Sequence, residues 1–272
     1  QHAAHVGEPS RDLEIGEACI GFQVEGIHDH RGRILRRKDA GPDAHQVIEA
    51  KLLGGRHLRQ RSEPRCRRHG IGFDRAGLRL LDIGCGWGGL GLYMHRHFGI
   101  EVLGVSLAPD QVKFANERAE AAGVADKVQF KLMDYRDVEG PFDRITSVGM
   151  IEHVGAPHFR EYFAKTGNLL ADDGIMLTHT IGRVDGPGTT DKWTRKYIFP
   201  GGYIPALSEL VRAMEQTRWE IGDVELLRYH YAHTLSEWYR RTTLHEAEIS
   251  ALYDGRLFRM WQFYLAGAEQ SF

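Results

Sequence analysis

The stretch LLDIGCGWGGLGLYMHRHFG (residues 80–99) decides the fold, because an apolar run breaks into glycines and then continues with a helical pattern. Gly84, Gly86 and Gly88 stand two residues apart, which is more glycine than a simple turn needs. Each glycine costs backbone entropy on folding, so the chain must gain something from the bare backbone here. We expect a ligand to lie against this turn.

Strand and helix patterns alternate along the chain from this stretch onward. Apolar runs typical of buried strands occupy residues 78–84, 101–107, 127–134, 142–150 and 174–182. Helical patterns follow at residues 88–99, 108–123 and 157–174. Such alternation predicts an α/β fold with a doubly wound parallel sheet, and ligands of such sheets bind at the carboxyl ends of the strands.

Composition excludes several classes of protein. The chain has 272 residues with a formal net charge of −2, which argues against a dedicated nucleic-acid binder. Its three cysteines are far apart and odd in number, so we expect no disulfide framework, no metal site and a reducing cytoplasm. No apolar run approaches the roughly 18 residues of a membrane span, and the first residues lack the apolar core of a signal peptide, so secretion is not expected.

The first 76 residues differ from the rest. Residues 1–70 hold a single aromatic residue, Phe22, and the basic run RGRILRRKD (residues 31–39). AHQVIEAKLLGG (residues 44–55) is the one stretch that we interpret as a short helix. We expect a poorly packed or disordered arm. Two alternatives stay open, namely a nucleic-acid-binding or lipid-binding tail, and a stretch read out of frame.

Two classes of cofactor use a glycine turn after the first strand of such a sheet. The turn GCGWGG (residues 84–89) fits either a dinucleotide or S-adenosylmethionine. Asp82 stands two residues before its first glycine. A carboxylate there would repel a pyrophosphate and attract the cationic methionine end of S-adenosylmethionine. We therefore favour S-adenosylmethionine, although Asp82 could equally cap the turn.

Polar residues also follow the next two strands. Ser106 ends the second strand, and with Gln111 it could hold ribose hydroxyls, although it could equally cap the following helix. Asp134 ends the third strand and could accept a hydrogen bond from an adenine amino group, with Tyr135 packed on the ring. A plain surface turn is the alternative for these two residues.

Five motifs occur in a fixed order: LLDIGCGWGG (80–89), GMIEHVG (149–155), HTIG (179–182), KYIFPGGYIP (196–205) and RMWQFYL (259–265). With them, residues 77–272 resemble the cyclopropane-fatty-acyl-phospholipid synthase family, which includes the mycolic acid cyclopropane synthases. The resemblance implies a Rossmann-like class I methyltransferase sheet with a helical cover over a lipid tunnel. It also implies an inserted lid around residues 185–215.

The resemblance carries site residues onto this chain. It implies a bicarbonate site made from Glu152, His179, Ile181 and Tyr231, of which Glu152, His179 and Tyr231 are the expected catalytic residues. Residues expected to surround the cofactor are Asp82, Gly84, Cys85, Gly86, Trp87, Gly88, Ser106, Leu107, Gln111, Asp134, Tyr135 and Arg136.

The implied reaction is transfer of a methyl group from S-adenosylmethionine to the double bond of an unsaturated phospholipid acyl chain, followed by ring closure as bicarbonate removes a proton. The implied place is the cytoplasm, peripheral to the inner face of the membrane. Two alternatives are methyl transfer to a small amine or other soluble acceptor, and an inactive remnant that only binds the cofactor.

The chain departs from the family pattern in three places. Residues 1–76 lack a recognisable Tyr-Ser-Cys stretch, and Cys19 has no aromatic neighbours of the expected kind. Ala268 stands where some members carry a cysteine, so no catalytic thiol is assigned there. The sequence stops before a final strand, so we expect a six-stranded sheet, or a hole at that edge, from residues 77–272.

Overall fold

The structure is a computed structural model that describes residues 47–56, 76–183 and 185–272, with the backbone alone for residues 47–56. The arm expected within residues 1–76 lies largely outside the described residues, and so do Phe22, Cys19 and the basic run at 31–39. Described strands are β1 (Val47–Arg56), β2 (Arg79–Ile83), β3 (Glu101–Ser106), β4 (Val128–Leu132), β5 (Phe142–Val148), β6 (Leu170–Arg183) and β7 (Trp219–Leu226).

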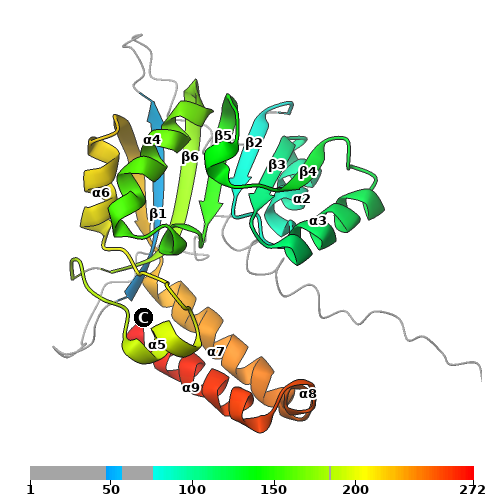
Figure 1. Cartoon of the computed structure of the whole chain (residues 1–272), viewed down its shortest axis with the longest axis vertical. Coiled ribbons are helices and arrows are strands. Elements are labelled where there is room, and N and C mark those ends of the chain that lie inside the picture. Colours follow the sequence, from blue (N-terminus) through cyan, green and yellow to red (C-terminus); the bar gives the residue numbers. More distant parts are fainter. Residues whose placement is uncertain (1–46, 57–75, 184) are drawn as a thin grey trace, which may run out of the picture. The chain divides into compact units, whose positions relative to one another are not determined.

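One sheet contains all seven of these strands, in the order β4-β3-β2-β5-β6-β1-β7. The five strands from β4 to β6 pair in parallel, while β1 is antiparallel to both β6 and β7 (Figure 1). The carboxyl ends of the parallel strands therefore meet at one edge of the sheet. This arrangement confirms the Rossmann-like α/β prediction.

The antiparallel strand β1 corrects one expectation and leaves another in place. Residues 44–55 were expected to form a short helix, but Val47–Arg56 form β1 and lie between β6 and β7. Residues 77–272 supply six strands, as expected, and β1 from residues 47–56 adds a seventh strand between β6 and β7. Pairing on both sides satisfies backbone groups of β6 and β7 that would otherwise be exposed, and this outweighs a weak local helical pattern.

Helices cover both faces of the sheet. On one face, α2 (Gly89–Phe98) and α3 (Pro109–Ala121) pack over a cluster that contains Leu80 and Phe130. On the other face, α4 (Phe159–Leu169) and α6 (Leu207–Glu215) pack over a cluster that contains Leu81. Leu80 and Leu81 enter different clusters because successive strand side chains point to opposite faces.

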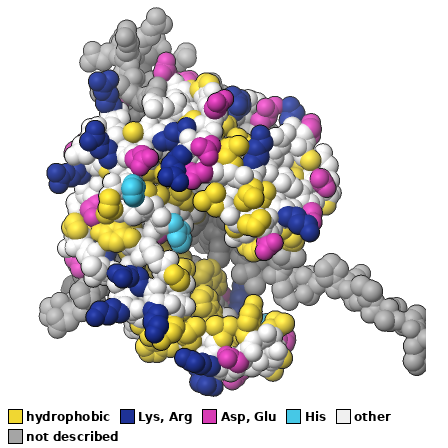
Figure 2. Space-filling model, in the orientation of Figure 1, with side chains coloured by type: hydrophobic (Ala, Val, Ile, Leu, Met, Phe, Trp, Pro, Cys, Tyr) yellow, Lys and Arg dark blue, Asp and Glu magenta, His cyan; other side chains and the backbone are white. Residues whose placement is uncertain are grey.

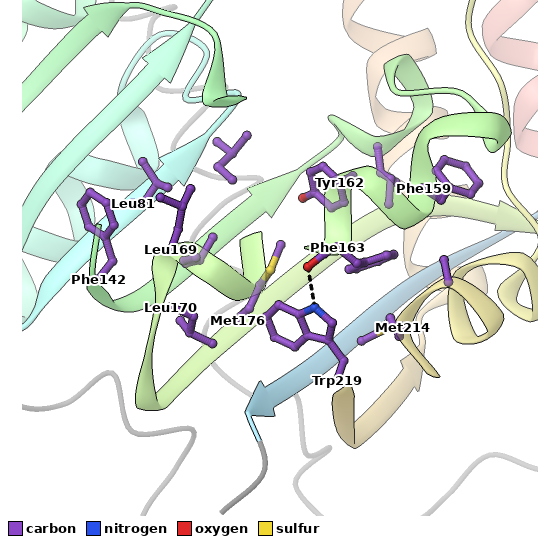
Figure 3. Packing of buried hydrophobic residues seen from close by; sticks show 14 of the residues in the cluster. Leu81, Phe142, Phe159, Tyr162, Phe163, Leu169, Leu170, Met176, Met214 and Trp219 are labelled. Atoms are coloured by element: carbon purple, nitrogen blue, oxygen red, sulfur yellow. Dashed lines mark hydrogen bonds between the residues drawn. The ribbon is translucent and has the colours of Figure 1, made fainter. Parts of the chain in front are cut away.

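The second cluster is centred on α4 and reaches β7. Trp219, at the start of β7, is buried and donates its indole N–H to the Phe163 carbonyl at 2.8 Å (Figure 3). Tyr162 and Phe163 lie beside it with no exposed surface. β6 begins at Leu170, four residues before the expected strand, because Leu170 already pairs with Phe142.

The C-terminal part of the chain is helical. It comprises α5 (Lys192–Tyr197), α7 (Arg228–Leu244), α8 (Glu246–Leu252) and α9 (Gly255–Ser271). α7 and α9 pack against each other through Leu235, Leu265 and Phe272 (Figure 1). Within the lid range expected at residues 185–215, α6 buries Leu210 in the core of the sheet domain, and the lid itself stays a prediction.

None of the helices in the described part of the chain combines the length and the hydrophobicity needed to cross a membrane.

The Trp219 hydrogen bond generates a stability prediction. Trp219→Phe leaves the buried Phe163 carbonyl without its donor, so we expect the free energy of unfolding to fall by about 1–3 kcal/mol in urea titrations. Trp193→Phe on α5 is the matched control and should change it by less than about 0.5 kcal/mol. Equal stability of Trp219→Phe and the parent would contradict the role given to this bond.

Candidate active site

The glycine turn after β2 uses its three glycines differently. Gly84, Gly86 and Gly88 all have positive φ angles, of 79°, 52° and 80°. A Cβ on Gly88 would lie 2.8 Å from both Ala115 and Phe130, so this glycine lets α2 begin close against α3 and β4. A Cβ on Gly86 would meet no atom of residues 76–183 or 185–272 within 4 Å. The backbone of Gly86 therefore faces open space, where a ligand could approach it.

Asp82 lies beneath this turn, in β2, with only 2% of its surface exposed. Its Oδ1 accepts a hydrogen bond from the Thr146 hydroxyl at 2.9 Å, and the two residues are direct partners in the β2–β5 pairing. Burial raises the pKa of Asp82 to about 6, and the Thr146 bond opposes part of that rise. The carboxylate is therefore a costly buried charge near neutral pH.

Cys85 and Trp87 occupy the turn itself. Cys85 is buried, and burial together with the Asp82 charge raises the pKa of its thiol to about 12. The thiol therefore stays protonated at neutral pH and is no nucleophile. Trp87 is half-exposed and rests edge-on against Phe114, with ring centroids 5.5 Å apart.

Ser106 at the end of β3 makes a capping hydrogen bond, and its role in holding a ribose stays a prediction. Its hydroxyl accepts the Ala108 N–H at 3.2 Å, which fixes the start of α3. It also donates to Gln111 Oε1 at 3.4 Å, so the two predicted residues do lie together. Leu107 between these residues is exposed, and it offers an apolar surface at the same edge of the sheet.

Asp134 after β4 is already engaged by a neighbour. Arg136 donates to both oxygens of Asp134, at 3.0 and 2.6 Å, and this hydrogen bonding holds the carboxyl pKa below its ordinary value. Tyr135 is partly buried and packs edge-on against Tyr162 at 5.4 Å. Tyr135 and Arg136 belong to a 3₁₀ turn, Tyr135–Asp137, so the structure brings all three predicted residues to the end of β4.

Glu152 lies in the 3₁₀ turn Ile151–His153, after β5. Its Oε1 accepts the Ile181 backbone N–H at 2.8 Å, which ties this turn to β6. Its Oε2 is buried, and no group in the described part of the chain forms a hydrogen bond with it. The Tyr203 N–H donates to the Glu152 carbonyl at 2.9 Å, so the KYIFPGGYIP segment is fixed to the same residue. A buried carboxylate oxygen without a donor needs a ligand or a water to satisfy it.

His179 and Tyr231 reach the same part of β6. His179 is buried in β6, two residues before Ile181, so their side chains point to the same face. Tyr231 on α7 packs in the cluster that includes Ile181, and its ring lies 4.9 Å from that of Phe272. Glu152 thus contacts Ile181 directly, and Tyr231 packs against the same cluster as Ile181, while a shared site with His179 stays a prediction.

Sequence reasoning missed Thr146 as part of the site. The available signal was a lone Thr beside Ser147 within the apolar run FDRITSVGM. Its importance appears only when β2 and β5 pair, because Asp82 and Thr146 are 64 residues apart in the chain.

Known proteins similar to this chain agree with these motifs. The family model described as mycolic acid cyclopropane synthetase matches residues 71–272. The cyclopropane-fatty-acyl-phospholipid synthase of Escherichia coli K12 is 39% identical over 198 residues, which cover 73% of this chain and 50% of that protein. A probable fatty acid methyltransferase of Pseudomonas putida is 39% identical over 207 residues, covering 72% and 52%. The chain therefore spans about half the length of these curated relatives.

Solved structures of cyclopropane synthases are also similar to this chain. The cyclopropane synthase MmaA2 from Mycobacterium tuberculosis has a TM-score of 0.67 and 26% identity, with 72% of this chain and 73% of that chain covered. A structure of the mycolic acid cyclopropane synthase CmaA1 complexed with SAH and CTAB has a TM-score of 0.67, 25% identity and the same coverage. The matched model spans well over half of the residues, and the chain belongs to the mycolic acid cyclopropane synthetase family.

Proposed function

We propose that this chain uses S-adenosylmethionine to methylate the double bond of an unsaturated phospholipid acyl chain, as a cyclopropane-fatty-acyl-phospholipid synthase does. The observation that carries the proposal is the buried Asp82 carboxylate beneath the open backbone of Gly86. A buried negative charge next to open space favours a cationic ligand over a pyrophosphate. The E. coli relative bears the name of this activity, which supports the choice of substrate.

The residues at the strand ends fit the cofactor. Its methionine end would lie against the glycine turn that follows the buried Asp82. Its adenosine would extend toward Ser106, Leu107 and Tyr135. Because Arg136 already occupies both oxygens of Asp134, we assign the adenine contact to the exposed Leu107 and to Tyr135 rather than to that carboxylate.

When bound, the cofactor would supply a methyl group activated by its sulfonium. The protein must then keep water away from the cationic acyl chain and hold a base for one proton. The unpartnered Oε2 of Glu152 suits a hydrogen bond from the O–H of bicarbonate. His179 and Tyr231 would orient the same anion. The proposed location is the inner face of the membrane, where such acyl chains are found.

One experiment tests the proposal directly. Titration calorimetry would measure binding of S-adenosylmethionine, and mass spectrometry of phospholipids after incubation would detect a gain of one CH2. Binding with a gain of CH2 is the expected result. Binding without it, but with methylation of a soluble amine, would favour the other acceptor class, and binding with no product would indicate an inactive remnant.

Replacing Asp82 should stabilise the folded protein but weaken its binding of S-adenosylmethionine. A folded-state pKa of about 6 means that the folded protein binds the Asp82 proton more tightly than the unfolded chain does. The protonated carboxyl therefore stabilises the folded state below pH 4, and this stabilisation is lost as pH rises through 6. Asp82→Asn resembles the protonated form, so its free energy of unfolding should exceed that of the parent by about 3 kcal/mol at pH 8 and match it near pH 4. Its affinity for S-adenosylmethionine at pH 8 should fall at least 10-fold. A variant less stable than the parent at pH 8 would contradict the assignment.

Alanine at Gly88 should mainly lower the stability of the fold, whereas alanine at Gly86 should mainly weaken cofactor binding. Gly88→Ala forces its Cβ against Ala115 and Phe130, so it should lower the free energy of unfolding by about 2–4 kcal/mol. Gly86→Ala meets no atom and costs only backbone strain of about 1 kcal/mol. It should instead weaken cofactor binding in calorimetry by at least 10-fold. Unchanged affinity in Gly86→Ala would place the ligand elsewhere.

Glu152→Gln tests the base site. The Gln side chain can still accept the Ile181 N–H but carries no negative charge. The rate of CH2 addition should fall by about 10²–10⁴-fold, with the dissociation constant for S-adenosylmethionine within two-fold of the parent value. Glu161→Gln, an exposed carboxylate on α4, is the matched control. An active Glu152→Gln enzyme would exclude this role.

A further inference from the structure

The fold brings together aromatic side chains from α5 and α9, which are about 70 residues apart in the chain. Trp193 on α5 lies edge-on to Phe263 on α9, with ring centroids 5.0 Å apart. Phe199, which follows α5, lies 5.8 Å from Tyr264 in the same way. Two aromatic pairs therefore fix the segment after Asp191 onto α9.

These contacts leave part of the aromatic surface uncovered. Phe263 is 66% exposed, and Tyr197 and Phe199 are each 41% exposed. Exposed rings on adjoining segments form one apolar surface, and such surfaces are usually covered by a partner. On a pair of helices surrounded by water, aromatic rings of this size usually pack inward, away from solvent.

Basic side chains surround the rings. Lys192, Arg195 and Lys196 all lie on α5 and are exposed. The Lys196 ammonium is 4.9 Å from the centre of the Tyr197 ring. Figure 2 shows Lys and Arg side chains next to hydrophobic ones over this part of the molecule. We call this surface the α5 patch, and its members are Lys192, Arg195, Lys196, Tyr197, Phe199 and Phe263.

The α5 patch carries positive charge that is not cancelled within its own segment. Residues 192–199 contain three basic residues and no acidic one. Asp191 directly before them accepts the N–H groups of Trp193 and Thr194, so it serves as the cap of α5. The patch thus joins an uncovered aromatic surface to a net positive charge.

We propose that the α5 patch docks on the surface of a bilayer that contains anionic phospholipid. Aromatic rings favour the interface between headgroups and acyl chains, and basic side chains are drawn to anionic headgroups. Each basic residue near such a surface strengthens binding by about a factor of five. The purpose of docking rests on the proposed function, because docking would bring the active site to acyl chains. The evidence for the surface comes from the residues of the α5 patch alone.

The test is co-sedimentation of the full chain with vesicles of phosphatidylglycerol and phosphatidylcholine, and with vesicles of phosphatidylcholine alone. The parent should bind the anionic vesicles more tightly. The triple variant Lys192→Gln, Arg195→Gln, Lys196→Gln should bind them about 100-fold more weakly. The matched control Arg96→Gln, Lys113→Gln, Arg160→Gln removes three exposed charges from α2, α3 and α4 and should bind as the parent does. Phe263→Ala should weaken binding to both kinds of vesicle.

Three outcomes would overturn the proposal. They are equal binding by the triple variant and the parent, an equal loss in the control variant, and a change of oligomeric state in the triple variant without a change in vesicle binding. The last would identify a second copy of the chain as the occupant. CH2 addition is measured separately on detergent-dispersed phospholipid. Absence of CH2 addition would count against the proposed function. Only the vesicle-binding results test the role of the α5 patch.

Discussion

The site depends on one electrostatic constraint, the burial of the Asp82 carboxylate inside the sheet. Removing this charge from water costs free energy, and the single hydroxyl of Thr146 offsets only part of that cost. The strands must therefore hold the carboxylate in place through the packing of their apolar neighbours. A cationic ligand at the glycine turn would complete this local charge balance, so the same burial that weakens the folded state strengthens binding.

The second half of the site depends on the backbone of β6. Ile181 offers its N–H to Glu152 and its side chain to the cluster that contains Tyr231, so one residue connects the turn after β5 with α7. Tyr203 fixes the Glu152 carbonyl from the other direction. Glu152 is therefore positioned by two other segments, while among the described residues no group donates to its Oε2. A rigid, incompletely satisfied acceptor is what a small hydrogen-bonding anion requires.

Local patterns were enough to predict much of the fold, and long-range contacts explain the rest. The helices α2 and α3 and the strands β2 to β5 follow apolar spacing that lies within a few residues, so the sequence predicts them closely. β1 forms because β6 and β7 offer unpaired edges, and nothing within residues 44–55 indicates those partners. Thr146 and the α5–α9 contact also depend on residues far along the chain. The resemblance indicated Glu152, His179 and Tyr231, whereas the contact between Glu152 and Ile181 depends on the tertiary structure.

The two charged regions of this molecule differ in how solvent affects them. Asp82 is shielded from water and ions, so its interaction with a cationic ligand is screened little by salt. The basic side chains of the α5 patch are exposed, and salt at physiological concentration screens them beyond about 8 Å. Cofactor binding and docking to a bilayer should therefore respond differently to ionic strength. In the function proposed here, burial of Asp82 would give selective binding of a small cation, and exposure of the α5 patch would give weak, reversible attraction to an anionic surface.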